Sequence, residues 1–154
     1  ARSLTFELSP PILYELGFEA AAEWLGEQIL KKYNIAFRLE DDGRPKPLSD
    51  DARVLLFLSL RELVINIAKH SKANNAKVSL RRESDYIAVT VEDDGVGFDA
   101  ESPEFEIMKA ASFGLFSTRE RLTRLGGSLE ITSRPGQGTK VIMVAPLKSE
   151  ERIP

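Results

Sequence analysis

The sequence has no cysteine, no long apolar run and no excess of positive charge. The absence of cysteine excludes disulfide bonds and thiolate metal sites. No apolar run approaches the roughly 20 residues that a membrane-spanning helix needs. Lysine and arginine number 21 against 24 aspartate and glutamate residues, which gives a formal charge of −3. We therefore expect no general basic field and no nucleic-acid partner.

The rest of the composition suits one folded domain. The chain has 154 residues, of which 42% are hydrophobic, enough for one sizeable core. It does not begin with Met. We expect it to be a domain of a longer protein, and any membrane segment of that parent would lie elsewhere.

Hydrophobic periodicity predicts an α+β fold with about three main helices on one antiparallel or mixed sheet. Ser49 is a good N-cap for the central helix, and Gly126-Gly127 should end the last one. Residues 41–47 form a turn-rich connector, and 94–114 a long loop that could include a short helix at 105–111. The predicted helices cover 18–33, 50–71 and 115–125, and the predicted strands cover 35–39, 77–82, 86–92, 129–133 and 140–145.

The central helix carries regularly spaced polar residues in an otherwise apolar stretch. It ends with RELVINIAKHS, residues 61–71, after the apolar VLLFLSL of residues 54–60. At about 100° per residue, its polar side chains fall in one narrow stripe. They are Ser59, Glu62, Asn66 and Lys69, with His70 at the edge of the stripe. The stripe is either an ordinary solvent face or a surface that meets a partner or ligand.

A second polar stretch, VEDDGVG, lies at the end of a predicted strand. Asp93 would place a hydrogen-bond acceptor at the rim of the sheet. Gly95 and Gly97 would let the backbone approach a ligand closely. The alternative is a plain hairpin turn, in which Asp-Gly is common.

Two further stretches are rich in glycine. FGLFSTRERL, residues 113–122, places Gly114 at the start of a helix, where free N–H groups favour an anion such as phosphate. Arg119 and Arg121 add positive charge, although helical arginines commonly face solvent. PGQGT, residues 135–139, is either part of a site or simply a hairpin.

The four stretches, in this order, resemble the nucleotide-binding boxes of the GHKL superfamily, which includes gyrase, Hsp90, histidine kinases and MutL. RELVINIAKHS resembles the N box, DDGVG the first glycine box, FGL the start of the second, and GQGT the last. The residues of these stretches are similar to those of the catalytic ATP-binding domain of bacterial two-component sensor histidine kinases, in particular the nitrate-sensor-like group. The resemblance implies a Bergerat ATP-binding fold, a two-layer α/β sandwich. It assigns 1–17 to the end of a linker from dimerisation helices, 18–148 to the catalytic domain and 149–154 to a tail.

The resemblance implies that the N box holds the metal and the phosphates of ATP. Asn66 would bind Mg²⁺ against the phosphates, and Glu62 would orient or polarise the attacking group. Lys69 and His70 would lie along the phosphate path. The side-chain oxygen of Asn66 is a suitable ligand, because Mg²⁺ prefers oxygen ligands and keeps several waters.

The glycine boxes are implied to hold adenine. Asp93 would accept a hydrogen bond from the adenine amino group, and Gly95 and Gly97 would shape the pocket around it. Thr139 would reach the adenine directly or through water.

A lid is implied between the two glycine boxes, closed by Gly114 and Leu115 at a helix start. Two positions depart from the family pattern. Asp94, where many members have Asn, adds a negative charge near the site, and Ser112 replaces a glycine often found there. We expect the acidic side chains of this segment to face solvent, or the lid to be disordered without ligand. They are Asp99, Glu101, Glu104 and Glu106.

The implied activity is transfer of the γ-phosphoryl group of Mg-ATP to a histidine on a separate dimerisation segment, followed by transfer to an aspartate of a response regulator. The parent would be a homodimer with this domain in the cytoplasm, and it could be membrane-anchored. His70, the one histidine, sits in the N box, so we expect that it is not the phosphoacceptor and that the chain alone does not phosphorylate itself. Two alternatives stay open: a stand-alone serine kinase of the anti-sigma type, and a degenerate nucleotide-binding module.

Overall fold

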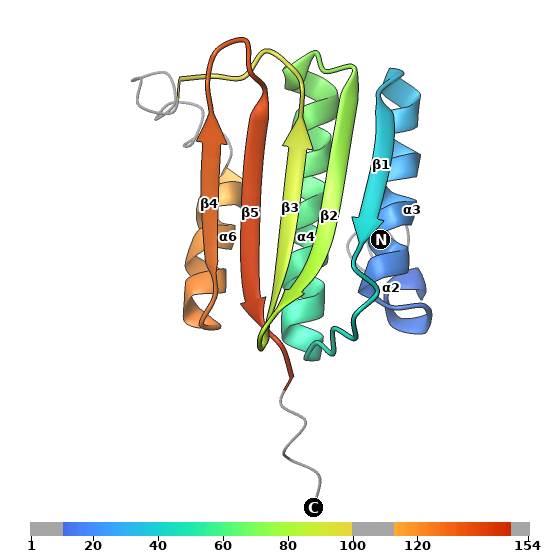
Figure 1. The fold of residues 1–154 in the computed structure, drawn as a ribbon, viewed down its shortest axis with the longest axis vertical. Coiled ribbons are helices and arrows are strands. Elements are labelled where there is room, and N and C mark those ends of the chain that lie inside the picture. The colour runs from blue at the N-terminus through green and yellow to red at the C-terminus, as the bar shows by residue number, and fades with distance from the viewer. Residues whose placement is uncertain (1–10, 100–112, 149–154) are drawn as a thin grey trace, which may run out of the picture.

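The computed structural model describes residues 11–99 and 113–148. One face of a five-stranded sheet is covered by helices (Figure 1). The strands are β1 (Ala36–Asp41), β2 (Asn75–Glu83), β3 (Tyr86–Asp93), β4 (Ser128–Ser133) and β5 (Thr139–Pro146). The helices are α2 (Pro11–Glu15), α3 (Phe18–Leu30), α4 (Asp50–Asn66) and α6 (Phe113–Arg124), with a 3₁₀ turn η1 (Lys31–Tyr33) and a π-helical turn η2 (Ile67–Ser71). None of the helices in the described ranges combines the length and the apolar character needed to cross a membrane.

The sheet is mixed, with strand order β1-β2-β3-β5-β4. β1 runs parallel to β2, and every other neighbouring pair is antiparallel. A parallel pair needs a crossover, which α4 supplies. This connection brings the end of α4 close to the start of β2. The predicted α+β two-layer fold is therefore confirmed, and the choice left open between an antiparallel and a mixed sheet is decided.

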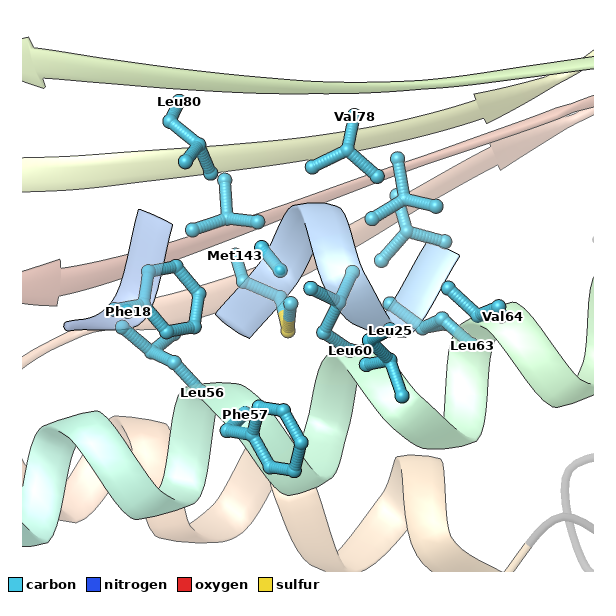
Figure 2. Close-up of a cluster of buried hydrophobic side chains, with 14 of the residues drawn as sticks. Phe18, Leu25, Leu56, Phe57, Leu60, Leu63, Val64, Val78, Leu80 and Met143 are labelled. Carbon is cyan, nitrogen blue, oxygen red and sulfur yellow. The ribbon is translucent and has the colours of Figure 1, made fainter. Parts of the chain in front are cut away.

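α4 is the central element of the core, with α3 on one side and α6 on the other. Leu56, Leu60 and Val64 are almost fully buried and face the sheet residues drawn in Figure 2. The N-terminus of α4 is capped as expected, because the Ser49 hydroxyl accepts the Ala52 N–H at 3.2 Å. Burial of this apolar surface is the main stabilising contribution to the fold.

Most predicted boundaries agree with the structure to within two residues, and the three predicted helices differ from the structure in the following ways. The helix expected over 18–33 is α-helical only to Leu30 and continues as η1. The helix expected from 115 begins at Phe113. The helix expected over 50–71 changes to π-helical geometry at Ile67. The short helix considered at 105–111 lies outside the described residues.

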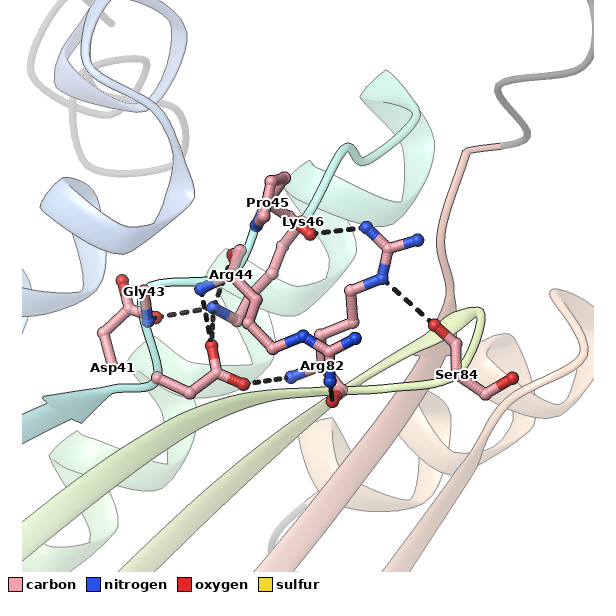
Figure 3. Close-up of polar contacts among 8 residues, drawn as sticks. Asp41, Gly43, Arg44, Pro45, Lys46, Arg82 and Ser84 are labelled. Atoms are coloured by element: carbon pink, nitrogen blue, oxygen red, sulfur yellow. Dashed lines mark hydrogen bonds and ion pairs between the residues drawn. The ribbon is translucent and has the colours of Figure 1, made fainter.

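The connector after β1 is held to the β2–β3 hairpin through Asp42, whose carboxylate also pairs with a buried lysine (Figure 3). The Lys46 side chain is 1% exposed, and its Nζ pairs with the carboxylates of Asp41 and Asp42. The other Asp42 oxygen accepts the Arg82 N–H at 2.8 Å. The hydrogen bond from Lys46 holds the pKa of Asp42 far below its usual range. This cluster fixes the end of the sheet that carries the β2–β3 hairpin.

Candidate functional site

The four polar stretches singled out in the sequence gather at the other end of the sheet (Figure 1). Here α4 ends, β3 ends, β4 turns into β5, and α6 begins. The strand pairing aligns Ala76, Asp93, Thr139 and Ser133 in one row across β2, β3, β5 and β4. Side chains alternate along each strand, so this row faces the helices, one step beyond the last buried apolar row.

One residue of this row, Asp93, is half-buried at the end of β3. Its Oδ1 accepts the Gly95 N–H at 2.9 Å. Burial raises the pKa of the Asp93 carboxyl, and the neighbouring Asp94 charge adds to this effect, although the backbone N–H groups of Gly95 and Thr139 oppose it. A partly desolvated carboxylate at the end of a central strand is suited to accept a hydrogen bond from a ligand.

The loop after Asp93 packs against the end of the N-box helix. The Val96 N–H donates to the Ser71 carbonyl oxygen at 2.7 Å. A Cβ on Gly95 would lie only 2.2 Å from that same oxygen, so the contact requires glycine. The stretches that resemble the N box and the first glycine box therefore touch at their ends.

The same loop packs against the β4–β5 hairpin on its other side. The Gly136 N–H donates to the Val96 carbonyl oxygen at 2.7 Å. Gly97 has φ of 64°, and a Cβ there would lie 2.1 Å from the Arg134 carbonyl oxygen. The plain hairpin considered for the Asp-Gly stretch is therefore wrong, because β3 is joined to β2 at its other end. The hairpin considered for residues 135–139 is correct.

Asp94 holds the loop to the start of β2. Its Oδ1 accepts the backbone N–H groups of Asn74 and Asn75, both at 2.9 Å, and its Oδ2 accepts the Asn75 side-chain amide at 2.8 Å. The Asn75 side chain is the main reason that the pKa of Asp94 is lowered. The sequence showed an extra charge here but not these partners, which are about 20 positions away along the chain.

The N-box residues do not form the straight stripe that α-helical spacing predicts. η2 has i→i+5 hydrogen bonds, a wider turn than an α-helix, and such turns are frequent at functional sites. Glu62 and Asn66 are half-buried before this turn, whereas Lys69 and His70 within it are exposed. Extension of the 100° periodicity beyond Asn66 was therefore wrong.

Ser59, the first member of the stripe, is covered by α6. It is 2% exposed, and its hydroxyl donates to the Leu55 carbonyl oxygen at 2.5 Å and lies 3.3 Å from the Thr118 hydroxyl. A solvent-face interpretation is wrong for this residue. Ser59 and Thr118 instead hold α6 against α4, one turn away from Glu62 and from the start of α6.

Gly114 and Leu115 lie in the first turn of α6, as the sequence predicted. Arg119 is half-buried, and its Nε donates to the Leu129 carbonyl oxygen at 3.3 Å, whereas Arg121 is exposed. Arg119 is thus held to β4, and a contribution of either arginine to phosphate binding stays a prediction. Most of the implied lid, including Ser112, Glu101, Glu104 and Glu106, lies outside the described residues.

The protein oxygens available at this site suit a Mg²⁺ ion that binds together with nucleotide phosphates. In the described part of the chain, no group of three or more His, Cys, Asp or Glu residues could hold a metal ion. Asn66 offers a half-buried amide oxygen one turn after Glu62. Mg²⁺ is commonly held in this way, by one or two protein oxygens together with substrate phosphates and water.

Ser133, on β4, is a residue of the site that the sequence interpretation missed. Its hydroxyl accepts the Phe98 N–H at 2.9 Å, donates to the Gly138 carbonyl oxygen at 3.0 Å and lies 2.9 Å from the Thr139 hydroxyl. No local pattern in the sequence marks it, because Phe98 is 35 positions away along the chain.

Residues 51–149 match the family described as "Histidine kinase-, DNA gyrase B-, and HSP90-like ATPase". The chain is 37% identical over 151 residues to an uncharacterised sensor-like histidine kinase of Chloroflexus aurantiacus, covering 96% of this chain and 25% of that protein. It is 33% identical over 139 residues to the sensor histidine kinase ComP of Bacillus subtilis, covering 90% and 18% of the two chains. It is 30% identical over 153 residues to LiaS, a sensor histidine kinase of the same organism, covering 98% and 40%. The chain thus spans less than half the length of these relatives.

The fold is also found among solved structures. The histidine kinase domain of the blue-light activated histidine kinase from Erythrobacter litoralis EL346 superposes with a TM-score of 0.68 at 20% identity. The superposition covers 84% of this chain and 61% of that one. At this identity the likeness establishes the fold alone.

Proposed function

The chain belongs to the histidine kinase-, DNA gyrase B- and HSP90-like ATPase family, and from this membership we propose that it binds Mg-ATP and donates the γ-phosphoryl group to a histidine. It corresponds to the catalytic domain of its relatives, which are named sensor histidine kinases. Its place in the nitrate-sensor-like group stays a prediction.

The half-buried carboxylate of Asp93 is the observation that carries the proposal. It stands at the end of the core, and the loop that follows it is held by two close backbone contacts that only glycine permits, at Gly95 and Gly97. A purine amino group needs an acceptor held rigidly at such an edge. We propose that Asp93 binds the adenine amino group, that the two glycines shape its pocket, and that Thr139 contacts the base directly or through water.

The phosphates would extend from the base toward the end of α4. Asn66 would hold Mg²⁺, and exposed Lys69 and His70 would contact phosphate oxygens. Bound Mg²⁺ would neutralise charge on the phosphates, which phosphoryl transfer requires more than covalent help from the protein. Glu62 would orient or polarise the attacking imidazole. Gly114 and Leu115 would close the lid.

The acceptor and the regulator belong to the rest of the parent protein and its pathway. We propose that residues 18–148 form the catalytic domain, and that residues 1–17 lead in from dimerisation helices that carry the phosphorylated histidine. The parent would act as a homodimer in which this domain lies in the cytoplasm, where ATP is available, and would pass the phosphoryl group to a response regulator. The names of the relatives favour this function over a stand-alone serine kinase or a degenerate module.

Calorimetry with the 154-residue chain tests the proposal. Mg-ATP should bind the wild type, and Asp93→Ala should weaken binding by about 1–3 kcal/mol, the cost of leaving a buried polar group without its partner. Asp85→Ala, in the exposed β2–β3 turn at the opposite end of the sheet, is the matched control. No binding by the wild type would support the degenerate module, and equal binding by the Asp93 variant would refute the adenine assignment.

A second assay tests the role of His70. With γ-labelled ATP the chain alone should acquire no phosphohistidine, because His70 lies beside the phosphates and not on an acceptor helix. An acid-labile, base-stable label on this chain would contradict the proposed division between catalytic domain and acceptor.

A further inference from the structure

The hydroxyl of Ser133 lies at a junction of three segments at the site. It contacts the loop after β3 through Phe98, the β4–β5 turn through Gly138, and the first residue of β5 through Thr139. Ser133 is 8% exposed, whereas Thr139 beside it is only half-buried and can meet a ligand. Ser133 itself has no role in the function proposed above, and of its three contacts only Thr139 has one.

The direction of each hydrogen bond at Ser133 follows from the chemistry of its partners. The Phe98 N–H can only donate, so Ser133 accepts from it at 2.9 Å. The Gly138 carbonyl oxygen can only accept, so the single hydroxyl proton of Ser133 is used there, at 3.0 Å. The remaining contact, 2.9 Å to Thr139 Oγ1, is then satisfied only if Thr139 donates. Ser133 thereby makes one donated and two accepted bonds, the full capacity of a hydroxyl.

The consequence falls on Thr139. Because its proton is directed to Ser133, its hydroxyl can meet a ligand only as an acceptor. Its partner across the strands is Asp93, whose carboxylate also accepts. Two acceptors therefore stand side by side on the helix-facing side of the sheet.

We propose that Ser133 is a positioning residue that fixes Thr139 as an acceptor and so makes the site select a 6-amino purine over a 6-oxo purine. The proposal rests on the nucleotide site proposed above. A 6-amino group can donate to both acceptors, whereas a 6-oxo purine offers them a third acceptor at position 6 and a single donor at N1, so at least one acceptor is left unpaired. Without Ser133, the Thr139 hydroxyl is free to rotate and to donate to a 6-oxo group.

The test compares Mg-ATP with Mg-ITP, which carries a 6-oxo group and an N1–H in place of the 6-amino group and the bare N1. Dissociation constants are measured by calorimetry on the 154-residue chain. The wild type should prefer ATP, and Ser133→Ala should reduce the ratio of the two constants about tenfold, the value of one neutral hydrogen bond gained or lost. Ser128→Ala, at the exposed start of the same strand, should keep the wild-type ratio.

Further variants separate selectivity from folding. In Ser133→Cys the thiol is a weak donor and acceptor of nearly the same shape, so the ratio should fall in the same direction even if Ser133→Ala does not fold. Thr139→Val should also reduce the ratio, and Ser133→Ala should then add no further change in the double variant.

The outcomes distinguish this inference from the proposed function. A folded Ser133 variant that loses affinity for ATP and ITP equally would overturn the inference and leave Ser133 with a structural role only. A wild-type ratio in Thr139→Val would overturn it as well. Absence of ATP binding by the wild type would instead remove the proposed function, and this inference with it.

Discussion

Gly95→Ala is expected to destabilise the chain, because it would push the loop after β3 away from the end of the N-box helix. A Cβ at residue 95 would lie 2.2 Å from the Ser71 carbonyl oxygen, whereas real Cβ contacts essentially never fall under 3.0 Å. The two segments would therefore have to separate by about 0.8 Å. That separation would break the 2.7 Å hydrogen bond from the Val96 N–H to the same oxygen.

The magnitude combines two costs. Forcing an extra methyl into a packed contact costs about 1–3 kcal/mol. Loss of the Val96 hydrogen bond costs about 0.5–1.5 kcal/mol. We use the lower half of this range, because Val96 is exposed and water can accept its N–H in place of the Ser71 carbonyl oxygen. We expect a loss of about 2–3 kcal/mol in the free energy of unfolding. Gly95 does not have positive φ, so this loss is steric and not a backbone preference.

Urea unfolding followed by circular dichroism measures the loss. Gly43→Ala is the matched control, because Gly43 has φ of 76° but no atom within 4 Å of the added Cβ. It should cost only backbone strain, about 1–2 kcal/mol. Gly95→Ala should also weaken Mg-ATP binding, whereas Gly43→Ala should not. A Gly95 variant within about 0.5 kcal/mol of wild type would refute the packing argument.

Three further predictions concern charge and metal binding. Lys46→Met should lower stability at pH 7 by about 2–4 kcal/mol, because it removes a buried partner of two carboxylates, while exposed Lys32→Met should change it little. Asp42 has a lowered pKa when folded, so its contribution is present above its unfolded pKa of about 4 and is lost as the pH falls below it. The difference between wild type and Lys46→Met should therefore shrink in acid, and a difference that stays constant to pH 2 would contradict this origin. Asp93 has a raised pKa, so its charge costs stability at neutral pH, and Asp93→Asn should stabilise the ligand-free chain at pH 7, an advantage that disappears below the unfolded pKa of about 4. Thermal unfolding at both pH values measures this, and a less stable variant at pH 7 would count against it. Asn66→Ala should weaken nucleotide binding with Mg²⁺ present and have little effect when Mg²⁺ is omitted, and a large effect without metal would argue against coordination.

Local patterns in the sequence predicted the elements and their order because each pattern reports a local property. Alternation of apolar residues located the strands, and the apolar face of residues 18–33 is buried through Phe18 and Leu25. The Ser49 cap and the end of α6 at Gly126, with φ of 92°, follow from short-range chemistry as well. These features required no knowledge of distant segments.

The parts that the sequence did not reveal depend on distant partners. The π-helical turn ends at Ser71, whose carbonyl oxygen bonds Val96, 25 positions later. α-Helical periodicity carries no information on such a contact. Asp94 and Ser133 hold the site through residues about 20 and 35 positions away, so neither stands out in its own neighbourhood.

Lys46 is an intermediate case. Its i,i+4 spacing from Asp42 is visible in the sequence, but this spacing predicts an ion pair only on a helix, and both residues lie in a non-helical connector. A turn-rich connector also predicts exposed side chains, and the burial of Lys46 follows only from the fold of the β2–β3 hairpin against this connector.

Amide NMR spectra of the ¹⁵N-labelled chain, titrated with Mg-ATP, show whether the end of α4 and the loop after β3 form the two sides of one nucleotide site. The amide signals of Asn66, Asp93 and Thr139 should shift together with one dissociation constant, while that of Ser84 in the β2–β3 turn stays unchanged. Shifts confined to the β2–β3 turn, or separate dissociation constants for Asn66 and Asp93, would contradict a single nucleotide site.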